Sequence, residues 1–110
     1  MLAPVRASLA DDKPLKWNRV AVLPDYVFFR HDIHIAKGVG CVECHGRVDQ
    51  EDIVRQQQPL SMGWCLECHR DPGPHLRPRD QVTNMEWHAN GPVAQARPVN
   101  PPQQCSGCHR

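Results

Sequence analysis

The stretch CVECH, residues 41–45, recurs in outline as CLECH at 65–69 and CSGCH at 105–109. Together the three pentapeptides use all six cysteines of the chain and three of its seven histidines. Each holds two cysteines separated by two residues and followed directly by a histidine. This spacing is typical of c-type haem attachment, because two thiols add across the vinyl groups on one porphyrin edge while the adjacent histidine binds the iron. The motifs therefore predict three covalently bound haems c.

This interpretation assigns nine residues to haem binding: Cys41, Cys44, His45, Cys65, Cys68, His69, Cys105, Cys108 and His109. Two other uses of paired cysteines explain the pattern less well. A zinc ribbon closes its four-thiolate site with two cysteine pairs, which leaves a third pair and three histidines without a role. Disulfides within Cys-x-x-Cys are usually redox-active, and the chain lacks the strand and helix pattern of a thioredoxin-like fold.

The composition favours a fold organised by its cofactors. The chain has 110 residues, of which only three are Trp, one Tyr and two Phe, while eleven are Pro. Its apolar residues occur in twos and threes, so a side-chain core of ordinary size is not expected. Three haems would supply the missing apolar mass. We expect a small, mostly irregular fold with a few short α-helices around the haems and little or no β-sheet, and a haem-free chain that is unfolded.

Four segments stand out from this pattern. Residues 1–16 are expected to form an extended N-terminal leader, and residues 17–110 the trihaem domain. Within that domain, VDQEDIVRQQ at 48–57 is expected to form a short helix. GPVAQARPVNPPQQ at 91–104 holds four prolines and is expected to be an extended connector to the third motif.

Charge and hydropathy exclude several classes of partner. A net charge of +1 gives no basic stripe for nucleic acid. No apolar run approaches the roughly 20 residues of a transmembrane helix. The start, MLAPVRASLADD, lacks the regions of a signal peptide. Because haem c is attached outside the cytoplasm, a periplasmic or extracellular location, peripheral to a membrane at most, is still expected. Three arginines (Arg70, Arg77 and Arg79) could pair with haem propionates, dock an acidic partner or form a solvated face.

The three irons need further axial ligands. Four histidines lie outside the motifs, His31, His34, His75 and His88, and Met62 and Met85 are the next candidates. A histidine and methionine pair would give a higher potential than two histidines. His31 and His34 are three residues apart, so on a helix they point in similar but not identical directions and could reach two neighbouring irons.

The arrangement of a phenylalanine, His-x-x-His and a short spacer before CVECH resembles the N-terminal module of class III multihaem cytochromes c. The resemblance implies that His31 pairs with His45 on haem 1, and that His34 pairs with His69 on haem 2 or His109 on haem 3. Trihaem members of that class place another ligand between their first two motifs, but residues 46–64 contain no histidine. The remaining ligand is therefore expected from His75 or His88.

A second resemblance covers about residues 15–110. The strings LPDYVFFRHDIH, GVGCVECHGRVDQ, QPLSMGWCLECHR, LRPRDQVTNMEW and CSGCHR are similar to the periplasmic multihaem cytochrome c subunit of alternative complex III, the quinol-oxidising membrane complex, and its relatives. This resemblance implies electron transfer from a quinol-oxidising membrane complex toward a soluble cytochrome or an oxidase.

The predicted function is electron transfer by three haems, mainly with two histidine ligands each, in a respiratory or photosynthetic chain. Six-coordinate irons leave no place for a substrate, so the protein is expected to be a carrier and not an enzyme. Two alternatives stay open. One is self-association through the haems into a haem chain running between copies. The other is a multihaem redox enzyme with one five-coordinate iron.

Overall fold

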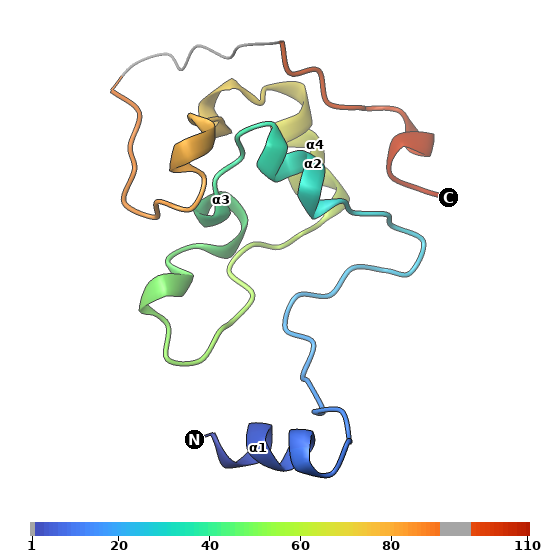
Figure 1. The fold of residues 1–110 in the computed structure, drawn as a ribbon. Coiled ribbons are helices and arrows are strands. Elements are labelled where there is room, and N and C mark those ends of the chain that lie inside the picture. The colour runs from blue at the N-terminus through green and yellow to red at the C-terminus, as the bar shows by residue number, and fades with distance from the viewer. Residues whose placement is uncertain (1, 91–97) are drawn as a thin grey trace.

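The structure is a computed structural model that describes residues 2–90 and 98–110 (Figure 1). Its α-helices are α1 (Ala3–Ala10), α2 (His31–Ala36), α3 (Cys41–His45) and α4 (Met62–Arg70). Its 3-10 turns are η1 (Val48–Gln50), η2 (Gly73–His75), η3 (Arg79–Gln81) and η4 (Cys105–Gly107). Within the described residues the only β pairing is two isolated bridges, Val27 with His109 and Val39 with Leu76. The expected class, mostly irregular with a few short helices, is confirmed.

The N-terminal segment differs from the extended leader that was expected. Ala3–Ala10 forms α1, with Pro4 in its first turn, and Figure 1 shows this helix apart from the rest of the chain. Alanine is the best helix former, and proline is tolerated in the first turn because its missing N–H would have no partner there. No residue of α1 is buried. Local propensity, and not packing, therefore accounts for the helix.

The prediction of a helix at 48–57 is wrong except for its first three residues. Only Val48–Gln50 is helical, as η1, and Ile53 and Val54 are 74% and 46% exposed. A helix this short is marginal in water unless an apolar face packs on a neighbour, and these two side chains find none. Of the predicted connector at 91–104, residues 91–97 lie outside the described residues, and residues 98–104 contain no helix or strand.

The buried interior is very small. Among the described hydrophobic residues only Leu76 and Val82 are buried, and Arg77 is the one buried charged residue there. The radius of gyration is 17.0 Å, whereas a compact chain of this length would have about 13 Å. Phe28, Phe29, Ile33 and Ile35 are each about half exposed, at 46–51%. The chain alone leaves apolar surface uncovered around α2, as expected for a fold completed by a large apolar cofactor.

Two backbone pairings position the motifs. Arg77 N–H donates to Gly38 O at 2.8 Å, and Cys41 N–H donates to Val82 O at 3.0 Å. These bonds hold the start of the first motif against residues 76–82. Phe28 N–H donates to Cys108 O at 2.8 Å, which holds the third motif against the segment before α2. Across residues 2–90 and 98–110, no helix combines the length and apolar character needed to cross a bilayer.

Candidate haem sites

All three motifs adopt helical turns. The first motif forms α3, and the second lies in α4, whose first turn is capped by Ser61 Oγ accepting from Trp64 N–H at 3.3 Å. The third begins with η4, where His109 N–H donates to Cys105 O at 2.8 Å. Residues three and four apart on a helical turn share one face. Each turn can therefore present two thiols and an imidazole to the same side, as haem attachment requires.

The first motif histidine faces a second histidine. The ring centroids of His31 and His45 are 6.0 Å apart, and the ring planes are within 8° of parallel. A metal–imidazole bond of about 2 Å on each side, with about 1 Å from each ligating nitrogen to its ring centre, gives roughly 6 Å between centroids. The spacing therefore fits an iron between the two rings.

The second motif has a similar ring spacing with a larger angle between the ring planes. His34 and His69 have ring centroids 6.2 Å apart, with planes 41° apart. His34 Nδ1 donates to Arg30 O at 2.7 Å, and His69 Nδ1 donates to Pro102 O at 2.7 Å. A proton held on Nδ1 leaves the Nε2 lone pair for a metal, which is the usual way that outer partners orient ligating imidazoles. Both rings are thus prepared to bind an iron through Nε2.

Phe29 is a residue of this site whose role the sequence did not reveal. Its ring lies edge-on to His31 at 5.2 Å and against His34 at 4.6 Å between centroids. It therefore packs against both of the α2 histidines at once. The available signal was its position, two residues before His31.

The third motif has a different neighbour. Tyr26 lies 5.7 Å from His109 between ring centroids, with planes 41° apart, and His109 Nδ1 is buried without a hydrogen-bond partner. No described ring contact or hydrogen bond joins His109 to His75 or His88. Figure 1 shows η4 and η2 on opposite sides of α2. Among the described residues, the ring contact of His109 is therefore with Tyr26 and not with a second histidine.

His75 and Arg77 share one carboxylate. His75 Nδ1 donates to Glu43 Oε2 at 2.9 Å, and Arg77 Nη2 donates to Glu43 Oε1 at 3.0 Å. Arg77 also donates to Asn84 O at 3.0 Å, and its guanidinium lies 5.1 Å from the Trp87 ring centre. The suggested roles of Arg77 on a solvated face or at a docking surface are therefore wrong, because it is 3% exposed and already paired. Arg70 and Arg79 are exposed.

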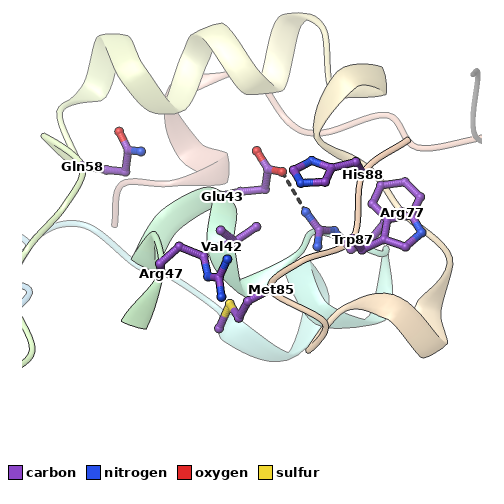
Figure 2. A pocket seen from close by; sticks show the side chains of 8 residues that line it. All are labelled: Val42, Glu43, Arg47, Gln58, Arg77, Met85, Trp87 and His88. Atoms are coloured by element: carbon purple, nitrogen blue, oxygen red, sulfur yellow. Dashed lines mark hydrogen bonds and ion pairs between the residues drawn. The ribbon is translucent and has the colours of Figure 1, made fainter. Parts of the chain in front are cut away.

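The other ligand candidates lie in two places. Met85 and His88 line a cavity of about 440 Å³ beside the first motif, shown in Figure 2. Met62, at the first position of α4, is 62% exposed. The remaining residues around the cavity are Val42, Glu43, Arg47, Gln58, Arg77 and Trp87.

Three of the motif thiols lie where burial disfavours the thiolate. Burial raises the pKa of Cys44 to about 11, with the nearby Cys68 thiol as the next contribution. Burial also raises the pKa of Cys65 and of Cys68. All six cysteines are unpaired, and no group of three His, Cys, Asp or Glu side chains among the described residues could hold a metal ion.

No curated protein matches the chain. Residues 27–110 match the family described as cytochrome c7 and related cytochrome c. The match covers well over half of the chain and includes all three motifs together with His31 and His34. Cytochromes of this family are small multihaem proteins that carry electrons and are not enzymes, so the predicted multihaem cytochrome c, its covalent haem c and its electron-carrier role are confirmed. The chain therefore belongs to the family of cytochrome c7 and related cytochromes c.

Proposed function

We propose that the chain binds three haems c, mainly with two histidine ligands each, and passes electrons between redox proteins outside the cytoplasm. The observation that carries this proposal is the spacing of His31 and His45, 6.0 Å between ring centres, at the first motif. The haems supply one-electron chemistry when bound. The chain's own residues would bind the haems covalently, occupy both axial positions of each iron and determine the environment of each haem.

Each iron is assigned a proximal ligand from its own motif: His45, His69 and His109. His31 completes the first iron and His34 the second, which the 6.2 Å spacing to His69 supports. Because both distal histidines lie on α2, one short helix links two haems into a single unit. The third iron takes its sixth ligand from His75 or His88, with Met62 and Met85 as the next choices.

The spatial order of the motifs supports a linear path. The Cys44 and Cys68 thiols are close enough for their charges to interact, and so are those of Cys65 and Cys108. Gln103 Nε2 also donates to His69 O at 3.4 Å, so the chain before the third motif touches the end of the second. Electrons would therefore pass through the second haem on their way between the first and the third.

The partners are proposed from the sequence resemblance to the cytochrome subunit of alternative complex III. A quinol-oxidising membrane complex would donate electrons, and a soluble cytochrome or an oxidase would accept them. The location would be periplasmic or extracellular, because the haem c of this family is attached outside the cytoplasm. The haem-binding domain at 17–110 would dock these partners, and residues 1–16 would stand outside it.

Two measurements on the purified holoprotein test the proposal. Its intact mass should exceed that of the polypeptide by three haems, and the reduced protein should bind no carbon monoxide because all three irons are closed. Fewer than three covalently held haems would contradict the count. Carbon monoxide binding that persists in every association state would favour a multihaem enzyme with one open iron.

The position of His109 favours a second candidate, a haem chain assembled from several copies. His109 has no histidine beside it, while η2 lies across α2 from η4 (Figure 1). A histidine from a neighbouring copy could then complete the third iron. Size-exclusion chromatography tests this: a protein that stays monomeric at high concentration with all irons closed would exclude the assembly.

A further inference from the structure

We propose that Glu43 is a positioning residue that presents His75 to a haem iron and tunes the potential of that haem. The inference rests on the proposed ligation by histidine pairs, and it selects His75 over His88 for the remaining iron. Glu43 is the second variable residue of CVECH, so a residue of one attachment motif would orient the ligand of a different haem.

The geometry around Glu43 carries the inference. Its Oε2 accepts the Nδ1 proton of His75 at 2.9 Å, which leaves the Nε2 lone pair of His75 for a metal. A carboxylate that holds Nδ1–H of a ligating histidine fixes the tautomer and ring orientation and makes the imidazole a stronger donor. His34 and His69 also have Nδ1 engaged by an oxygen, at 2.7 Å each. His75 is therefore prepared in the same way as two of the proposed ligands.

Arg77 keeps the carboxylate in place. Its Nη2 donates to Glu43 Oε1 at 3.0 Å, and its side chain is 3% exposed. Gly40 leaves the room for this guanidinium, since a Cβ there would collide with it. The Glu43 side chain is 27% exposed, so the interaction is only partly screened by solvent. His75 itself is 41% exposed, which leaves its free edge accessible to an iron.

The equivalent positions of the other motifs lack these contacts. Glu67 holds the same place in CLECH, but it is exposed, and within the part of the chain that the structure describes its side chain has no hydrogen bond or ion pair. Gly107 holds it in CSGCH. His88 is exposed, and no hydrogen bond joins it to another of the described residues, 2–90 and 98–110. Of the two histidines left after the α2 pairs are assigned, His75 is the one that a contact among the described residues holds in an orientation suited to a metal.

Carbon monoxide binding to the reduced holoprotein tests the choice of ligand. His75→Ala should open one iron of three to carbon monoxide, whereas His88→Ala should open none. The wild-type protein is measured first, because closed irons there establish the ligation on which the inference rests. A wild-type protein with closed irons and a His75→Ala protein that also binds no carbon monoxide would overturn the inference alone.

Redox titration tests the role of Glu43. Glu43→Gln keeps an oxygen that accepts the His75 hydrogen bond but removes the negative charge. The midpoint reduction potential of one haem should therefore rise. Glu67→Gln removes the same charge at the matched position and should leave that midpoint unchanged. Equal shifts in the two variants would contradict a positioning role. In Glu43→Ala, one iron should in addition bind carbon monoxide in a fraction of the molecules. Glu43→Gln should not show this effect.

The same measurements show whether His75 binds an iron of its own chain or an iron of a second copy. If monomeric wild-type fractions bind no carbon monoxide, His75 acts on an iron of its own chain. If monomers bind carbon monoxide at one iron and lose this binding on assembly, His75 acts on an iron of a second copy. Either result supports the inference when His75→Ala leaves one iron open to carbon monoxide in the state where the wild-type iron is closed. An open iron that His75→Ala does not affect would overturn it.

Discussion

The imidazole rings of His31 and His45 lie within 8° of parallel at 6.0 Å between centroids, although fourteen positions separate them in the chain. Only α2, the loop at 37–40 and α3 separate them, so the first haem site is built almost entirely from one short segment. His34 lies on the same helix as His31, and its ring centroid is 6.2 Å from that of His69. Under the proposed ligation, residues 31–45 would form one complete site and half of the next.

Replacing His31, the proposed distal ligand of the first haem, should change one of the three proposed irons. In His31→Ala the first iron loses its sixth ligand, so the reduced protein should bind carbon monoxide at one iron. In His31→Met the iron keeps six ligands, and its midpoint should rise, because methionine favours the reduced state relative to histidine. A His31→Met protein whose midpoints all match those of the wild type would show that His31 is not a ligand.

Removing Phe29 should affect two irons at once. Its ring packs on both His31 and His34, so Phe29→Ala should loosen both distal ligands and allow partial carbon monoxide binding at two irons. The free energy of unfolding should fall by about 1–2 kcal/mol, less than for a fully buried phenylalanine, since the residue is 46% exposed.

Phe28→Ala is the matched control for Phe29. Phe28 is similarly exposed, at 51%, but its ring lies under Arg110 at 5.1 Å, and no ring contact among the described residues joins it to a histidine. The control should leave carbon monoxide binding at the wild-type level. If both variants open the irons equally, the packing of Phe29 on the histidines is not what holds them.

Gly40 should not tolerate a side chain. A Cβ at this position would collide with the Arg77 guanidinium, so Gly40→Ala should lower the free energy of unfolding of the holoprotein by about 1–3 kcal/mol. Gly63→Ala is the control, because a Cβ there meets no atom within 4 Å and lies in α4, where alanine is the better helix former. Denaturant titration measures both. An unchanged denaturant concentration at half-unfolding in Gly40→Ala would contradict the close packing of Arg77 on Gly40.

The haem-free chain should not fold. With only Leu76 and Val82 as buried hydrophobic residues among those described, the polypeptide lacks the apolar burial that offsets its conformational entropy. Far-ultraviolet circular dichroism of a variant with all six cysteines replaced by serine should show a largely disordered chain without a thermal transition. A cooperative transition would show that the polypeptide has a core of its own.

The sequence predicted the chemistry better than the course of the backbone. The three motifs and the spacing of His31 and His34 follow from bonding requirements, which are local and leave few alternatives. The helix at Ala3–Ala10 was missed because it packs on no other element, so no amphipathic pattern marks it. The helix expected at 48–57 failed for the opposite reason: its apolar residues, Ile53 and Val54, meet no partner surface.

The contacts of Arg77 could not be read from the sequence. Its pairing with Glu43 joins residues 34 positions apart, and it depends on Gly38 and Gly40 letting the backbone approach. Gly38 has φ of +88°, and a Cβ there would lie 2.5 Å from Arg77 O. Such a long-range pairing leaves no periodic signal. The same holds for Tyr26, whose contact with His109 depends on the pairing of Val27 with the C-terminal segment.

Near-infrared magnetic circular dichroism of the oxidised holoprotein tests the central claim most directly, because the charge-transfer band of low-spin ferric haem reports the pair of axial ligands. Three low-spin irons should contribute to the spectrum, and at least two of their bands should lie at the wavelength typical of two histidine ligands. A spectrum with one histidine-pair iron or none, or with His/Met bands at the first two irons, would contradict it.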